Sequence, residues 1–155
     1  MKKMNKMNKT NKMNISSILV TLLFIFSGSI WAQKADLVVN VKGFNSNKGT
    51  AIIYVFNAKK GFPSDESKAI KVINCKITDS KCATTIKGLN YGTYAISVLH
   101  DENANNKLDT NFLGMPKEGT GVSNNPDNDG PPSYNDAKFM LVENNKVNII
   151  IMKYL

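Results

Sequence analysis

The sequence contains few of the residues from which most catalytic and metal sites are built. Among 155 residues there is one histidine, His100, and there are two cysteines. A lone histidine rarely builds a transition-metal site, and the cysteines lack the two-residue spacing of a catalytic dithiol. No nucleophile motif surrounds Ser123 or Ser133. We therefore expect a protein that is not an enzyme, with a hydrolase that uses His100 and the nearby Asp101 or Asp109 as the alternative.

Long apolar runs are also missing. The apolar run at residues 15–26 is shorter than the roughly 20 residues that a membrane-spanning helix needs. It follows five lysines in the first dozen residues, and a basic start before a short apolar centre is typical of a secretory signal peptide. We expect residues 1–32 to be removed by cleavage after Ala32, or alternatively after Ser29, with an uncleaved membrane anchor as the rival interpretation. The protein would then be periplasmic or extracellular.

The excess of positive charge is concentrated in that leader. The formal net charge is +8 for the whole chain, but all 12 acidic residues lie in residues 33–155, where the net charge is about +3. A basic patch for nucleic acid is therefore not expected. We expect no transmembrane span after cleavage, and the expected partner is an unidentified envelope protein or a glycan.

Helical periodicity is absent from residues 33–155, whereas short strand-like segments recur between turn residues. The predicted strands are residues 37–42, 50–57, 69–77, 82–86, 94–99, 137–142 and 146–154. This pattern predicts an all-β fold, a single immunoglobulin-like or prealbumin-like antiparallel β-sandwich of about seven strands, with a small barrel as the alternative. Residues 50–57 are expected at its centre with both faces largely buried, and Pro63 to Glu66 suggest one short helical turn.

Turn signals predict how neighbouring strands pair. The Gly- and Asn-rich residues 43–49 suggest a hairpin between the first two strands. Asn144 and Asn145 suggest a terminal hairpin, because Asn tolerates the positive φ of a two-residue turn. In that register, three pairs of complementary residues lie opposite each other across the hairpin. They are Glu143 with Lys146, Val142 with Val147, and Met140 with Ile149.

The two cysteines lie close together in the sequence. A two-residue turn at Thr78 and Asp79 would place Cys75 directly opposite Cys82. Opposed strand residues have Cα separations that suit a disulfide, and the predicted compartment is oxidising. We therefore predict a disulfide, with two buried free thiols as the alternative.

A long polar loop at residues 100–136 begins with a calcium-loop pattern. Oxygen-bearing groups fall at positions one, three, five, seven and nine of that pattern. They are Asp101, Asn103, Asn105, the backbone carbonyl of Lys107, and Asp109. Asn106 replaces the usual Gly at position six and Phe112 replaces the bidentate Glu at position twelve, so a remote carboxylate would be needed. The candidates are Glu118, Asp127, Asp129 and Asp136.

The competing interpretation of this stretch is an Asn-rich turn whose side chains cap their own backbone. The remainder of the loop is rich in Gly and Pro and is too long for an ordinary structureless connection. We expect it to be ordered on the sandwich by anchors at His100, Phe112 and Tyr134, and to serve as a recognition surface. The alternative is a disordered excursion.

Several motifs carry a family resemblance. The runs HDENANNKLDTNFLGMPKEGTGVSNN and GPPSYNDAKF, with GTAIIYVFN and GLNYGTYAISVLHDEN before them, resemble the small exported bacterial proteins of domain of unknown function family 2141. Members often have Gly where this chain has Ala104 or Asn106, and the cysteine pair is not part of the family pattern. The resemblance implies no established activity.

A second, shorter resemblance concerns one turn. The sequence GLNYGTY at residues 88–94 is similar to a turn in prealbumin-like and carboxypeptidase-regulatory-like sandwiches, which are mostly accessory or adhesive modules. Fold analogy does not determine function. We expect an exported, non-catalytic binding or accessory module of the envelope, with calcium as the only cofactor to consider. A purely structural envelope protein is the further alternative.

Overall fold

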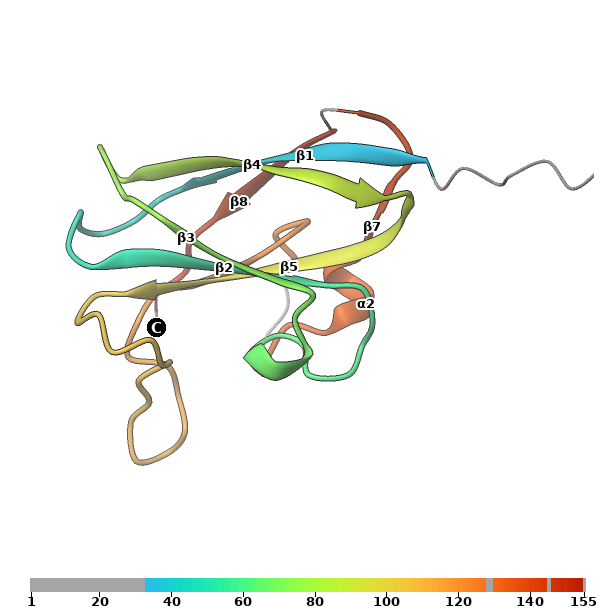
Figure 1. Cartoon of the computed structure of the whole chain (residues 1–155). Coiled ribbons are helices and arrows are strands. Elements are labelled where there is room, and N and C mark those ends of the chain that lie inside the picture. The colour runs from blue at the N-terminus through green and yellow to red at the C-terminus, as the bar shows by residue number, and fades with distance from the viewer. Residues whose placement is uncertain (1–32, 128–129, 145, 155) are drawn as a thin grey trace, which may run out of the picture. The chain divides into compact units, whose positions relative to one another are not determined.

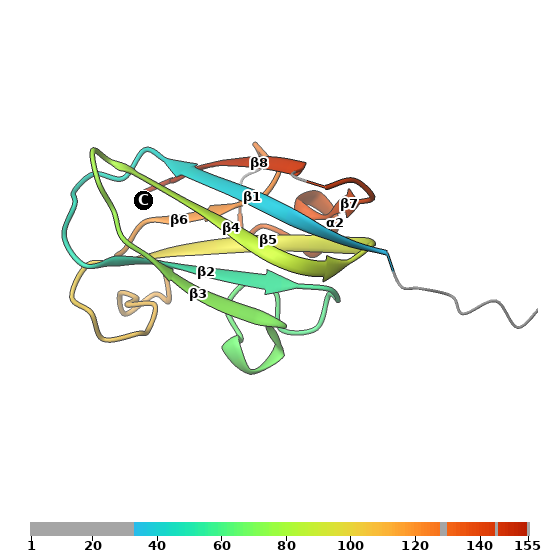
Figure 2. The ribbon, with the colours of Figure 1, turned by 45° about the horizontal axis from the view of Figure 1, so that its top comes forward.

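Two β-sheets lie face to face in the computed structural model, which describes residues 33–127, 130–144 and 146–154 (Figures 1 and 2). One sheet has the strand order β4 (Lys81–Asn90), β1 (Lys34–Lys42) and β8 (Lys146–Ile151). The other has the order β3 (Lys71–Cys75), β2 (Thr50–Phe56), β5 (Gly92–Asp101) and β6 (Thr120–Val122). β7 (Phe139–Leu141) also pairs with β5. The predicted all-β sandwich is confirmed.

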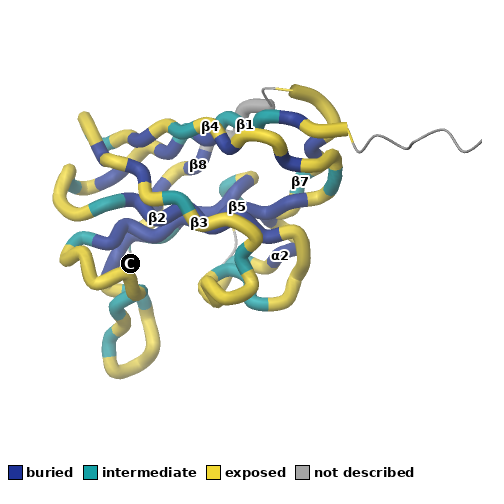
Figure 3. The backbone as a smooth tube through the Cα atoms, viewed as in Figure 1, coloured by how far each residue is buried: buried dark blue, intermediate teal, exposed yellow. Residues whose placement is uncertain are grey.

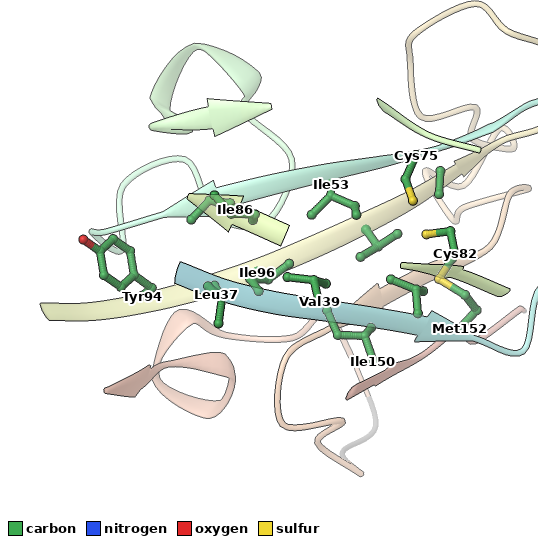
Figure 4. Close-up of a cluster of buried hydrophobic side chains, with 14 of the residues drawn as sticks. Leu37, Val39, Ile53, Cys75, Cys82, Ile86, Tyr94, Ile96, Ile150 and Met152 are labelled. Carbon is green, nitrogen blue, oxygen red and sulfur yellow. The ribbon is translucent and has the colours of Figure 1, made fainter. Parts of the chain in front are cut away.

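The centre of the larger sheet is buried on both faces, as predicted for residues 50–57. Ile53 and Val55 of β2 belong to the core between the sheets, which Figure 4 shows together with Leu37 and Ile96. The alternate face of β2, including Phe56, is covered by a second apolar cluster. A strand with β-branched and aromatic residues at nearly every position can fill two cores, because successive side chains point to opposite faces.

Two short helices cover that outer face. The 3-10 helix η1 (Glu66–Lys68) confirms the helical turn predicted near Pro63, and the Asp65 side chain accepts a hydrogen bond from Ser67 N at its start. The hydrogen bond from the Ser67 side chain lowers the pKa of Asp65. The other helix, α2 (Tyr134–Ala137), buries Tyr134 and Ala137. In Figure 3, β2 and β5, over which these coverings lie, are drawn largely as buried.

The predicted hairpin between the first two strands is wrong. β1 pairs with β4 and β8 in one sheet, whereas β2 pairs with β3 and β5 in the other. Residues 43–49 therefore carry the chain from one sheet to the other. The amides of Gly43 and Phe44 both donate to the Ser80 carbonyl, and the buried Phe44 ring extends into the core.

The predicted terminal hairpin is also wrong. β7 pairs with β5, so that Met140 lies opposite Thr93, and β8 runs parallel to β1, with Asn148 opposite Val39. This parallel pair departs from the expected all-antiparallel arrangement. The parallel register occupies the second edge of β1 and places Ile150 in the core, which a local hairpin would not do.

The described residues belong to one compact unit that begins after Trp31. Within them, no helix is long and apolar enough to cross a membrane. The predicted signal peptide, residues 1–32, lies outside the described residues.

Candidate ion-binding loop

The Asp101 carboxylate organises the first turn of the loop that follows β5. Asp101 is fully buried, and its Oδ1 and Oδ2 atoms accept hydrogen bonds from the backbone amides of Asn105 at 3.1 Å and Asn106 at 2.9 Å. Ala104 and Asn106 both have positive φ, 58° and 59°. Asn106 thus adopts the left-handed conformation for which a calcium loop normally uses Gly.

The other predicted ligands gather around this turn. The Oδ1 atoms of Asn103 and Asn105 accept hydrogen bonds from the amides of Asn105 and Lys107. The Nδ2 groups of the same two side chains donate to the Asp109 carboxylate, at 2.7 Å and 3.1 Å. The loop therefore brings Asp101, Asn103, Asn105 and Asp109 into one hydrogen-bonded network.

Glu118 is the remote carboxylate that joins the network. It is 6% exposed, and its Oε1 and Oε2 atoms accept hydrogen bonds from the amides of Glu102 and Asp109, each at 3.0 Å. Asp127 instead lies 3.7 Å from Lys153 Nζ, and Asp136 accepts from Ser133 Oγ beside α2. Asp129 lies outside the described residues.

The donor set is rich in amides and carbonyls. Among the residues that the structure describes, no three His, Cys, Asp or Glu side chains gather into a metal-binding group. Asparagine and backbone oxygens suit calcium, a hard cation with six to eight oxygen ligands, but not the softer transition metals. The chemistry open to this loop is therefore either calcium binding or capping of its own backbone.

His100 lies near the end of β5, and the hydrogen bonds of its ring go to residues outside the long loop. The ring is fully buried, with Nε2 2.9 Å from the Lys48 carbonyl and Nδ1 2.8 Å from the Tyr154 hydroxyl. Since a carbonyl can only accept, Nε2 carries a proton, and in the neutral ring Nδ1 accepts from Tyr154. Nδ1 also lies 3.6 Å from the Glu102 carboxylate. The ring also meets Phe44 edge to face at 5.1 Å between centroids. Burial raises the pKa of Tyr154, so its hydroxyl remains a donor.

The serines of the hydrolase alternative do not meet this histidine. Ser123 is fully buried, where its Oγ donates to the Ala137 carbonyl and accepts from the Ile96 amide. Ser133 Oγ donates to Asp136 at the start of α2. Within the described ranges, both ring nitrogens of His100 are already engaged with other groups.

The two remaining loop anchors have different outcomes. Tyr134 is 9% exposed and its ring contacts Phe62 edge to face, so that prediction is confirmed. Phe112 is 95% exposed, and its predicted packing on the sandwich is wrong. The reason is a local turn: Asn111 Oδ1 accepts from the amides of Leu113 and Met115, which closes the chain before Phe112 can reach the sheets.

Comparison with known proteins gives one match. A family model described as an uncharacterized protein conserved in bacteria, DUF2141, matches residues 39–149. The chain belongs to this family. No curated protein and no solved structure matches the chain. The likeness of its GLNYGTY turn to prealbumin-like sandwiches therefore stays a prediction.

The two cysteines of this DUF2141 domain face each other from different sheets. Cys75 ends β3 and Cys82 lies in β4, both are buried free thiols, and their sulfurs point toward one another (Figure 4). The predicted register, with Cys75 directly opposite Cys82 in one hairpin, is wrong, because Cys75 pairs with Ala51 of β2 and Cys82 pairs with Val41 of β1. The turn between the two strands also lies one residue later than predicted, at Asp79 and Ser80 with φ of 51° and 57°. Thr78 and Lys81 form an isolated bridge across it. Burial, followed by the neighbouring Cys75 sulfur, raises the pKa of the Cys82 thiol.

Sequence reasoning missed two residues that support the site in this DUF2141 domain, Gly49 and Tyr154. Gly49, with φ of +64°, lies against the backbone of Asp101 and leaves no room for a Cβ. The position of Gly49 just before a strand gives no indication of its long-range contact with Asp101. The sequence predicts Tyr154 only as part of a strand and does not indicate its contact with His100.

Proposed function

We propose that this protein is an exported, non-catalytic binding or accessory module of the bacterial envelope, and that residues 101–118 form a calcium-stabilised loop on it. One observation supports the ion most directly. Asp101 and Glu118 are 0% and 6% exposed, yet their carboxylates accept hydrogen bonds from backbone amides and not from lysines. Two buried carboxylates without a lysine partner carry negative charge that a divalent cation would offset.

The side chains need little rearrangement to accept such an ion. The oxygen of Asn103 and that of Asn105 each accept one backbone amide, which leaves a second lone pair free. Their Nδ2 groups would release Asp109, whose carboxylate would then turn toward the cation. The backbone carbonyl of Lys107 and the carboxylate of Glu118 would complete the predicted set.

The alternatives have weaker support. A purely structural envelope protein would use the same hydrogen bonds only to cap the loop, and the calcium experiment below separates this case. The hydrolase alternative needs a histidine that can reach a nucleophile, whereas His100 is buried between Lys48 and Tyr154. Its geometry favours the non-catalytic function. The partner we propose is another envelope protein or a glycan.

Calcium at about 10 mM is expected to raise the melting temperature of residues 33–155 by several degrees relative to excess chelator. A loop with so few carboxylates should bind calcium with Kd of about 0.1–1 mM, and ligand at one hundred times Kd adds about 2.7 kcal/mol of stability. Differential scanning calorimetry measures the shift. Asp109→Ala should remove it while leaving the fold, because Asp109 bonds only to exposed amide groups through its side chain.

Asp127→Ala is the matched control, because Asp127 lies in the same long loop but pairs with Lys153. Its calcium shift should equal that of the unchanged protein. Equal melting temperatures in calcium and in chelator would contradict the ion and leave the self-capped loop. The export proposal is tested separately by the cellular fraction and the mass of the expressed protein.

We also propose that Cys75 and Cys82 are oxidised to a disulfide after export, which would link the two sheets. The two thiols would together lose two protons and two electrons to an envelope oxidoreductase whose own disulfide is thereby reduced to a dithiol. Protein recovered from the envelope should then show no free thiol when denatured, and about 2–3 kcal/mol of stability should disappear on reduction. The double variant Cys75→Ala/Cys82→Ala should be insensitive to reductant. Two titratable thiols in the exported protein would contradict the bond.

A further inference from the structure

The turn at residues 111–115 carries an exposed apolar surface, which we call the apolar tip. It consists of Phe112, Leu113 and Met115, whose side chains are 95%, 69% and 45% exposed. The loop that carries the tip extends away from the two sheets, as the gold segment of Figure 1 and the exposed segment of Figure 3 show. Large apolar side chains gathered at one exposed projection indicate an interaction site more strongly than the same residues scattered singly.

The tip is an ordered structure. Asn111 Oδ1 accepts hydrogen bonds from the amides of Leu113 at 2.9 Å and Met115 at 3.0 Å. The Asn111 amide donates to the Met115 carbonyl, the Gly114 amide donates to the Asn111 carbonyl, and Thr110 pairs with Pro116. This backbone network holds the apolar side chains outward before any partner binds, so little conformational entropy remains to be lost on contact.

The charges around the tip have a consistent arrangement. Lys107 and Lys117, on the two arms of the loop, are exposed. The carboxylates of Asp109 and Glu118 instead face inward, toward the amide groups of the loop. A partner that approaches the tip therefore meets apolar side chains first and two positive charges beside them.

We propose that the apolar tip inserts into the surface of a lipid bilayer that carries anionic headgroups. A stable protein interface buries about 800 Å² on each partner, far more than three side chains on a narrow projection supply. A bilayer accepts a projection of any size, and its anionic surface complements exposed lysines near an inserted apolar group. This proposal does not rest on calcium, because Asn111 and not the ion-ligand set holds the tip.

A single tryptophan gives a direct test. The one natural tryptophan is Trp31, outside residues 33–155, so Phe112→Trp introduces the sole indole into the compact unit. Its emission should shift to shorter wavelength on vesicles of phosphatidylglycerol and phosphatidylcholine at low ionic strength. Met140→Trp is the control reporter, because Met140 is 62% exposed but lies on β7 away from the tip. Its emission should stay unchanged.

Vesicle co-sedimentation supplies the second measurement. Phe112→Ser/Leu113→Ser should lower the partition coefficient of residues 33–155 by about tenfold or more, because two apolar side chains no longer leave water. Met140→Ser should leave it unchanged. Lys107→Gln/Lys117→Gln should also weaken binding to anionic vesicles, since each basic residue near the surface contributes about fivefold.

Either of two results would overturn the proposal. One is an emission of Phe112→Trp that stays unshifted on anionic vesicles in both calcium and chelator. The other is a shift that appears without vesicles as the protein concentration rises, which would make the tip a contact between copies of this chain. The calcium proposal is tested separately by the melting temperature. The calcium proposal and the membrane proposal can therefore fail independently of each other.

Discussion

Replacing Gly49 by alanine is expected to destabilise the fold by about 4 kcal/mol or more, at the upper end of single-residue effects. A Cβ at this position would lie 1.8 Å from the Asp101 carbonyl oxygen and 2.7 Å from Glu102 Cα, and both of these are backbone atoms. Thr50, the next residue, is the first residue of β2 and pairs directly with Asp101, the last residue of β5. The clash can therefore be relieved only by separating the ends of two central strands.

Gly88→Ala is the matched control for this substitution. Gly88 also has a positive φ, +68°, but no atom lies within 4 Å of the position that its Cβ would occupy. It should therefore cost only the strain of a left-handed backbone, about 1–2 kcal/mol. Urea denaturation followed by circular dichroism gives both free energies of unfolding. Equal losses in the two variants would mean that the contact between Gly49 and Asp101 is not as tight as the structure has it.

Strand identity could be predicted from the sequence because it depends on local composition. The β-branched run of residues 50–57 is buried on both faces as β2, and the short turn near Pro63 appears as η1. Both predictions rest on side chains whose preferences act within a few residues. The residues that they pack against did not need to be known.

Strand pairing could not be predicted in the same way. The Asn144 and Asn145 turn fits a hairpin locally, with charges and apolar residues opposed. β8 instead pairs with β1, more than one hundred positions earlier. A local hairpin register competes with two other requirements, which are to cover a free sheet edge and to fill the core between two sheets. The spacing of residues in the sequence contains no information about these two requirements.

The predictions for the candidate loop also differ in outcome. The side-chain spacing of Asp101, Asn103, Asn105 and Asp109 predicted a network that the structure brings together. The contribution of Glu118 was one of four alternatives, because the length and path of the intervening chain determine which carboxylate returns. Phe112 failed as an anchor because the Asn111 side chain closes a tight turn, a local contact that hydrophobicity alone does not reveal.

Asp101→Ala is expected to destabilise the calcium-free protein by about 2–4 kcal/mol, the range for removing a buried charged acceptor from its hydrogen bonds. The substitution leaves the amides of Asn105 and Asn106 without their acceptor. Asp101→Asn should cost less, since one amide oxygen can still accept one of the two. Asp109→Ala should cost less than either, because Asp109 bonds through its side chain to exposed amide groups.

Amide hydrogen exchange locates this loss within the molecule. In Asp101→Ala the amides of Asn105 and Asn106 should exchange faster under conditions in which β2 remains protected, because the carboxylate holds the loop and not the sheet. The exchange rate of Leu113, whose amide bonds to Asn111, should change little and serves as the internal control. Unchanged exchange at Asn105 and Asn106 would mean that the loop holds its shape without Asp101. The two hydrogen bonds from Asp101 would then be a consequence of the turn, and its stability would have to come from Glu118 and the paired arms of the loop.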